Sequence, residues 1–311
     1  MLKKNEGGLI LLHLTTKILN KMNLVLLIFN FLCLIVFVIY FLKLKKAKAE
    51  LSTQVEKYES QKSEFLDSIT NAQRIQRAVL PAKETMDRFL EEYFIFYQPR
   101  DIVSGDFYWF EYYNCKLYIA VADCTGHGVP GAMMSLICNN ALLRALYDDG
   151  SQSTGELLNN TRVHVIENLS KGKFNISDGM DISLCCVDFL EYSIEWSGAN
   201  NPIWIIRNGE FIELKPNKCS IGKDINHHEF TTHCLNLSES DILYLFSDGY
   251  KDQFGGSENK KFLSKRFKQM IADVSIHPMS KQSELIEQNL REWMGNNPQV
   301  DDICVMGIKL V

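Results

Sequence analysis

The sequence predicts an α/β (α+β) fold in which two antiparallel sheets lie between layers of helices, preceded by a transmembrane helix and a coiled-coil linker. From about residue 94 onward, short β-rich runs are divided by Gly, Asn and Asp, with four helical stretches inserted and appended. Before that point the chain carries one long apolar run and a heptad pattern. We therefore expect a short N-terminal segment (1–23), a transmembrane helix (24–42), a linker (43–80) and a globular domain (81–311).

Composition excludes some classes of function. The 311 residues carry a net charge of −5, so there is no chain-wide basic surface to hold a phosphate backbone, and a nucleic-acid partner is not expected. The nine cysteines include no CxxC pair, which argues against a structural zinc site and a disulfide framework. A reducing compartment fits this pattern best.

The apolar run at 24–42 is long enough to cross a bilayer as a helix, and Asn30 is its only strongly polar residue. The alternatives are a buried core helix or the apolar part of a signal peptide. The run is too long for the latter, and no small-residue cleavage site follows. Lysines are denser after the run than before it, which places the C-terminal side in the cytoplasm: Lys43, Lys45, Lys46 and Lys48 against Lys17 and Lys21. The stretch LILLHL within 1–23 is too short to span and receives no role.

The linker repeats apolar residues with a 3,4 spacing, at Leu51, Val55, Tyr58, Phe65, Ile69, Ala72 and Val79. Lys62 and Gln76 interrupt this seam, which predicts an adjustable coiled coil and a homodimer. An ordinary amphipathic linker helix is the alternative. Pro81 ends the pattern.

The globular domain alternates strand and helix signals. Helices are expected at 130–147, 155–170, 260–273 and 281–294. Strands are expected at 94–98, from 106, and at 117–124, 182–189, 192–198, 203–208, 211–214, 230–237, 241–247 and 303–310.

Aspartates stand where strands meet turns, several of them Gly-rich: Asp106, Asp123, Asp248 and the pair Asp301 and Asp302. A single such Asp is often only a turn residue, but four rim positions after apolar strands are harder to explain in that way. If they converge, their charges require cations, and hard oxygen ligands suit Mg²⁺ or Mn²⁺. Two ions could hold a hydroxide nucleophile and clamp a phosphoryl group.

The phrases NAQRIQRAVLP (71–81), YQPRDIVSGDFYWF (97–110), VADCTGHGVPGAMMSL (121–136), SGANNP (197–202), YLFSDGY (244–250) and DDICV (301–305) resemble the SpoIIE-type branch of the metal-dependent type 2C protein phosphatases. The resemblance covers about residues 71–311 in the right order. It implies an αββα sandwich and Mn²⁺- or Mg²⁺-dependent dephosphorylation of phosphoserine or phosphothreonine. It also implies a bacterial protein and a substrate of the STAS type, a phosphorylated anti-sigma-factor antagonist. Together with the apolar run and the lysine bias, this predicts a single-pass protein of the bacterial inner membrane with a cytoplasmic catalytic domain.

Carried over by residue, the resemblance makes Asp123 the bridge between both metals and assigns catalysis to Asp123 and Asp106. The Cys124 backbone carbonyl is the adjacent ligand. Asp106, Asp248 and Asp301 complete the two sites. Asp302 stands beside the last ligand, where the family pattern has Asp or Asn, and is the second candidate at that position.

Four further residues stay open. His127 is either a general acid or a residue at a helix start, and Arg100 either grips phosphate or is a surface charge. Asp178 and Asp181 lie near the region of a third metal in some relatives, or in a plain turn.

Two other functions remain as alternatives. The phrase SGDF echoes the motif of a membrane nucleotide cyclase, although no nucleotide-binding pattern accompanies it. A non-catalytic module of the same fold would be expected to have lost metal carboxylates, and here all are present.

Overall fold

The computed structural model describes residues 6–171, 178–222, 228–239 and 241–310. These residues belong to two compact units, Met1–Asp67 and Ser68–Val311. Helix α1 (Glu6–Val79) supplies the described part of the first unit and continues into the second.

The first unit consists of one uninterrupted helix. The boundaries that the sequence analysis placed at residues 23 and 42 are not marked by any break in α1. Among the described residues, this is the one helix long and apolar enough to cross a membrane, with a mean hydropathy of 3.0 in its most apolar window. None of that window is buried in protein, unlike a core helix.

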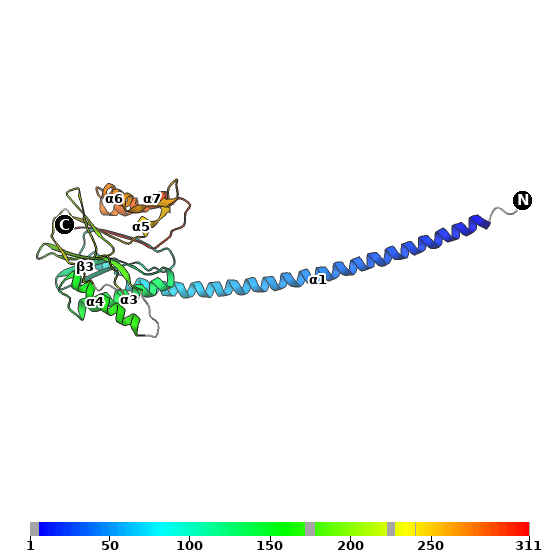
Figure 1. Ribbon diagram of the computed structural model, residues 1–311, viewed down its shortest axis with the longest axis horizontal. Helices are drawn as coiled ribbons and strands as arrows, with labels where there is room; N and C mark the ends of the chain where they lie inside the picture. The colour runs from blue at the N-terminus through cyan, green and yellow to red at the C-terminus, as the bar shows by residue number, and fades with distance from the viewer. Residues whose placement is uncertain (1–5, 172–177, 223–227, 240, 311) are drawn as a thin grey trace. The chain divides into compact units, whose positions relative to one another are not determined.

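The second unit contains two five-stranded antiparallel sheets (Figure 1). One sheet, called sheet A here, has the order β1-β12-β9-β6-β7. Its strands are β1 (Glu92–Gln98), β12 (Ile303–Lys309), β9 (Ile242–Phe246), β6 (Ile203–Arg207) and β7 (Glu210–Leu214). The other, sheet B, has the order β2-β3-β4-β5-β8. Its strands are β2 (Phe107–Tyr113), β3 (Lys116–Cys124), β4 (Met180–Asp188), β5 (Ser193–Ala199) and β8 (His233–Asn236).

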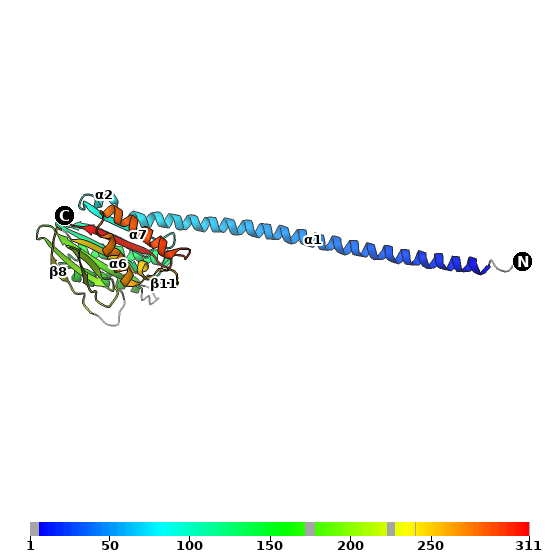
Figure 2. The same ribbon diagram turned by 90° about the horizontal axis from the view of Figure 1, so that it is seen from above.

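Helices cover the outer face of each sheet. In Figure 1, α3 (Gly128–Tyr147) and α4 (Thr154–Ser170) lie on one side of the sheets, and α6 (Leu263–Val274) and α7 (Met279–Met294) on the other. Figure 2 shows α6 and α7 over the sheet that contains β12, drawn in red. The predicted αββα sandwich is confirmed.

Three apolar cores hold these four layers together. Leu142 and Leu158 of α3 and α4 pack with Ile182 of sheet B in the first. Val121 and Leu245, from different sheets, belong to the second core, between the sheets. The third core joins sheet A to α6 and α7 and includes Trp204, Phe246, Phe267, Ile286 and Leu290.

The structure shortens or adds some elements. The strand expected at 230–237 is present only as β8, and the helix expected from residue 260 begins at Leu263. The short elements α2 (Lys83–Met86), α5 (Gly249–Asp252), β10 (Phe254–Gly255) and β11 (Lys260–Lys261) were not predicted. Elements of two to four residues are too short to carry a periodic pattern.

Candidate active site

The rim aspartates are brought together by strand pairing. Asp106 directly precedes β2, and Asp123 is the penultimate residue of β3. The register Phe107↔Ala122 puts both at the same end of sheet B. In sheet A, Asp248 follows β9 and Asp301 precedes β12, at the end where the two strands pair through Phe246↔Val305.

Both sheets contribute to one pocket of about 260 Å³. Asp123 lines it from sheet B, and Asp248 and Asp301 line it from sheet A. Asp106 does not line the pocket and is buried, with 2% of its surface exposed. Cys124 and His127 also line the pocket.

The carboxylates influence one another strongly. Burial raises the pKa of Asp106 well above its ordinary value; the Ser247 hydroxyl opposes this shift, and nearby Asp side chains reinforce it. Burial also raises the pKa of Asp123, with further contributions from Asp106, Asp248 and Asp301. The pKa of Asp301 is raised by burial and by neighbouring carboxylates. The four groups therefore form one electrostatic cluster.

The donor set fits hard divalent cations. Asp106 Oδ2 is buried and has no hydrogen-bond partner among the residues that the structure describes, which is costly for a carboxylate oxygen unless a cation contacts it. Within the described ranges, no three His, Cys, Asp or Glu side chains are grouped closely enough to hold one ion. Mg²⁺ is commonly bound through one or two carboxylates and several waters, so two ions shared among four spread carboxylates satisfy both observations.

Asp302 has a different environment from the other rim aspartates. Its Oδ1 accepts a hydrogen bond from the backbone N–H of Arg100 at 2.7 Å, and its Oδ2 accepts one from Gly105 at 2.7 Å. The side chain is buried and does not line the pocket. Asp302 thus ties the loop before β12 to the loop that carries Asp106.

Three loops approach closely beside the pocket. A Cβ atom on Gly105 would lie 2.4 Å from the Gly126 carbonyl oxygen, and one on Gly131 would lie 2.2 Å from the same atom. Gly249 is equally constrained, since its Cβ would lie 2.0 Å from the Asp302 carbonyl oxygen. Only glycine permits such backbone contacts.

His127 and Arg100, left open by the sequence, have different environments. His127 Nδ1 lies 3.0 Å from Asp101 Oδ2, which leaves Nε2 without a partner among the described residues. The Arg100 guanidinium donates to the Val300 carbonyl at 3.0 Å and does not line the pocket. Sequence reasoning missed Asp101, because it singled out the neighbouring Arg100, and pairing across 26 residues leaves no local pattern.

Asp181 also lines the pocket, whereas Asp178 does not. Asp181 Oδ1 accepts hydrogen bonds from Asn200 Nδ2 at 3.0 Å and Ser220 Oγ at 2.5 Å. Asp181 therefore anchors the segment around Ser220 at the pocket edge.

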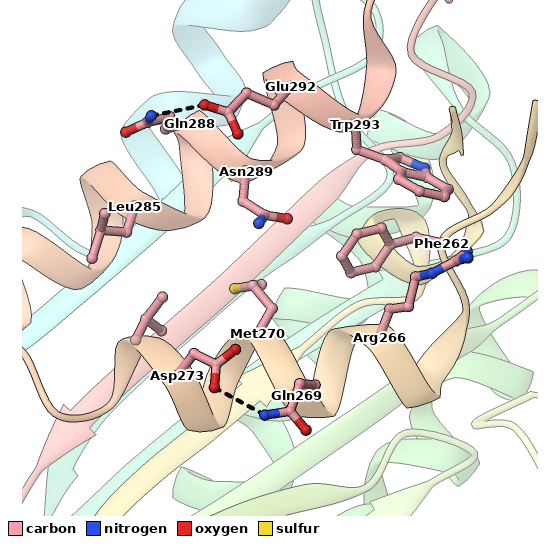
Figure 3. Close-up of a pocket in the computed structure, with 11 residues that line it drawn as sticks. Phe262, Arg266, Gln269, Met270, Asp273, Leu285, Gln288, Asn289, Glu292 and Trp293 are labelled. Atoms are coloured by element: carbon pink, nitrogen blue, oxygen red, sulfur yellow. Dashed lines mark hydrogen bonds between the residues drawn. The ribbon is translucent and has the colours of Figure 1, made fainter. Parts of the chain in front are cut away.

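A larger groove of about 570 Å³ lies between α6 and α7 (Figure 3). Met270, Leu285 and Trp293 contribute apolar surface there. Gln269 donates a hydrogen bond to Asp273 of the same helix, and Gln288 donates one to Glu292. None of the predicted site residues lines this groove.

Comparison with known proteins identifies the family. The family model described as Stage II sporulation protein E (SpoIIE) matches residues 114–311, more than half of the chain. The chain belongs to the SpoIIE family. The SiaA-PP2C domain of Pseudomonas aeruginosa is 32% identical, with a TM-score of 0.73, and the match covers 80% of this chain and 98% of that domain.

More distant solved structures share the fold of this SpoIIE-family protein. The PP2C phosphatase domain of SpoIIE from Bacillus subtilis, with a fragment of its regulatory domain, is 18% identical, with a TM-score of 0.55; the match covers 70% of this chain and 61% of that one. The RsbU and RsbW domains of a Mycobacterium tuberculosis protein are 16% identical, with a TM-score of 0.54, covering 70% and 60%. The comparison with curated proteins gave no match.

Family and fold together make this protein a PP2C-type protein serine/threonine phosphatase. They exclude the nucleotide cyclase considered from the SGDF phrase.

Proposed function

We propose that this phosphatase hydrolyses phosphoserine on a regulatory protein of the STAS type, with two Mn²⁺ or Mg²⁺ ions at the pocket shared by the two sheets. The observation that carries the metal proposal is the buried, partnerless Asp106 Oδ2 within a cluster of carboxylates of raised pKa. The substrate type rests on the family resemblance.

Each rim residue has a separate role in this proposal. Asp123 and Asp106 from sheet B, Asp248 and Asp301 from sheet A, and the Cys124 carbonyl hold the ions. Asp302 keeps the loops in place through its two backbone hydrogen bonds. We therefore assign Asp302 to positioning rather than to metal binding.

When bound, the two ions supply an activated water and neutralise charge on the phosphoryl group. The carboxylates determine the positions of the ions and therefore of the neutralised charge. Their own positions are fixed because the strand ends that carry them are held by strand pairing and by close backbone contacts at glycines. His127 Nε2, on an imidazole oriented by Asp101, has no competing partner within the described part of the chain and is available to the substrate.

We also propose that the enzyme is a single-pass protein of the bacterial inner membrane and that its catalytic domain lies in the cytoplasm. The apolar, unburied window of α1 supports this. Exposed side chains along the same helix, including Leu51, Tyr58 and Phe65, support a homodimer formed through the linker.

The test is phosphate release from a phosphoserine STAS protein by the full-length enzyme in detergent. Activity should require Mn²⁺ or Mg²⁺, fall to background in EDTA, and drop by at least about a hundredfold in Asp123→Asn, since the charge that holds the ions is lost. A small ester such as p-nitrophenyl phosphate should have a lower kcat/KM, because it lacks remote contacts. Full activity of Asp123→Asn in EDTA would refute the metal mechanism, and equal kcat/KM values would refute the protein substrate.

A further inference from the structure

Helix α1 continues without a break from the apolar run at 24–42 into the linker, so both parts share one helical phase. The linker seam includes Leu51 and Phe65, two heptads apart. The same steps of seven residues lead back from Leu51 to Leu44, Phe37 and Asn30. A heptad repeat keeps such positions on one side of a supercoiled helix. The seam therefore extends into the apolar run and contains Asn30.

The surrounding residues are consistent with this extension. Leu44 is the one large apolar residue in the lysine-rich stretch 43–48, and it lies on the seam. Lys48 interrupts the interleaved seam positions, as Lys62 does in the linker. The seam takes only two positions in every seven, so a polar residue placed without regard to it would fall elsewhere more often. The position of Asn30 is therefore informative.

Asn30 is a polar group in an apolar setting. It lies six residues after Leu24, or about 9 Å along the helix, and so within the hydrocarbon region when the run crosses a bilayer. Its side chain is exposed and has no hydrogen-bond partner among the described residues. No water is present in hydrocarbon to satisfy an amide, so an unpaired Asn is unfavourable there. A hydrogen bond from another helix would remove this cost.

A second copy of the chain provides a matching partner. The lysines that follow the run favour one orientation for every copy, so each copy presents Asn30 at the same depth. A carboxamide contains both donors and an acceptor, so two Asn side chains can bond each other. The other seam residues of the run are Leu27, Leu34, Phe37 and Phe41. Apolar side chains gain little by leaving lipid, so Asn30 is the seam residue that gains most from pairing.

We propose that Asn30 forms a hydrogen bond with Asn30 of a second copy inside the membrane and sets the register of the dimer. This inference rests on the membrane location and the homodimer proposed above. It adds a polar contact within the membrane to the pairing of the linker. Because α1 is continuous, that contact also aligns the seam of the linker that follows.

Two variants of identical composition test the proposal. Asn30→Leu with Leu34→Asn moves the amide to the next seam position, whereas Asn30→Leu with Leu32→Asn moves it off the seam. Energy transfer between donor- and acceptor-labelled copies of the full-length protein in detergent micelles measures the Kd of the dimer. Asn30→Leu should raise this Kd by about three- to tenfold, which is the range of interhelical hydrogen bonds in membranes. The seam exchange should restore it to within about twofold, and the off-seam exchange should not.

The outcomes separate this inference from the functions on which it rests. An unchanged Kd in Asn30→Leu would overturn the Asn30 contact and leave the linker dimer in place. Restoration by both exchange variants would mean that any amide in the run promotes association, which would overturn the seam assignment. Release of the wild-type protein from membranes by alkaline extraction would refute the membrane location, and a monomeric wild-type protein would refute the homodimer. Either result would overturn the Asn30 pairing as well.

Discussion

Two adjacent aspartates, Asp301 and Asp302, have opposite environments although the sequence presents them as a pair. Asp301 lines the pocket, whereas both oxygens of Asp302 accept backbone hydrogen bonds. A carboxylate that faces cations contributes to activity, whereas one that accepts hydrogen bonds from backbone N–H groups contributes to the stability of the fold. The local sequence cannot tell which is which, because the partners at Arg100 and Gly105 lie about 200 residues away.

This difference predicts separable effects of substitution. Asp302→Ala should lower the free energy of unfolding by about 1–3 kcal/mol, because it leaves the buried Gly105 N–H unpaired and removes a second hydrogen bond from the Arg100 N–H. Asp301→Ala should cost activity and metal affinity with little loss of stability. Urea unfolding in EDTA and Mn²⁺ titration of activity measure the two effects. A stable Asp302→Ala enzyme with weakened metal affinity would return that residue to the metal ligands.

The raised pKa of Asp106 predicts a pH-dependent cost in the metal-free protein. The folded state binds a proton that the unfolded chain, with an ordinary value near 3.9, has released, so stability falls as pH rises from about 4 through the raised pKa. Asp106→Asn removes this cost. In EDTA it should therefore stabilise the fold at pH 7, because the neutral amide does not carry the cost of a charged carboxylate in a buried site.

The gain from Asp106→Asn should shrink as the pH falls towards 4 and below, where the Asp106 carboxyl becomes protonated in the unfolded chain as well as in the folded state. Denaturant midpoints at pH 4, 5.5 and 7 would show this trend. A gain independent of pH would indicate that repacking, and not charge, explains the effect.

At the level of elements, the end of α1 is joined to the loop of Asp106. The sequence analysis placed Gln76 in the coiled-coil seam as a break, but this assignment was wrong: the side chain is buried in the second unit. Its Nε2 donates to the Ser104 carbonyl at 2.6 Å and to Ser135 Oγ at 2.9 Å, and its Oε1 accepts from the Ser104 N–H at 3.2 Å. Gln73 adds a bond to the Ile102 carbonyl at 2.6 Å.

These contacts predict that Gln76 positions the loop that carries Asp106. Leu in Gln76→Leu has a side-chain volume close to that of Gln but makes no hydrogen bond to the N–H and C=O of Ser104. The position of the Asp106 carboxylate should therefore be less well fixed. We expect the Mn²⁺ concentration for half-maximal activity to rise by about tenfold, corresponding to about 1.4 kcal/mol. Arg74→Ala, on an exposed position two residues away, is the matched control. An unchanged metal requirement in Gln76→Leu would reduce the contact to packing.

Strand and helix periodicity predicted both sheets and all four long helices of the second unit, because these elements alternate faces over enough residues to show a pattern. The rim aspartates were found for a related reason, since each stands where an apolar strand meets a turn. Asp101 and the role of Gln76 were not found. Each depends on contacts between distant segments, which periodicity does not encode.

At the scale of the whole molecule, the candidate site requires both sheets, because each contributes only part of the carboxylate cluster. The relative placement of the sheets is held by the core between them, where Val121 and Leu245 pack. Changes that loosen this core should therefore affect metal binding before they unfold the helix layers.

The linker part of α1 (43–80) also carries exposed apolar side chains. Tyr58 and Phe65 are 68% and 64% exposed, and Lys62 stands between them in the predicted seam. A charged residue at such a position lowers coiled-coil stability and leaves pairing geometry adjustable. An element poised between two arrangements can change the fraction of active enzyme greatly when shifted by a few kcal/mol.

Lys62→Leu should therefore strengthen dimerisation of the full-length protein and change its specific activity several-fold, because one arrangement of the linker is favoured over the others. Lys57→Leu adds the same apolar side chain away from the seam and should do neither. Analytical ultracentrifugation in detergent measures the first effect, and phosphate release at saturating Mn²⁺ measures the second. If Lys62→Leu tightens the dimer while activity stays constant, the linker is a passive tether; if both leucine variants tighten it equally, pairing does not follow the heptad seam.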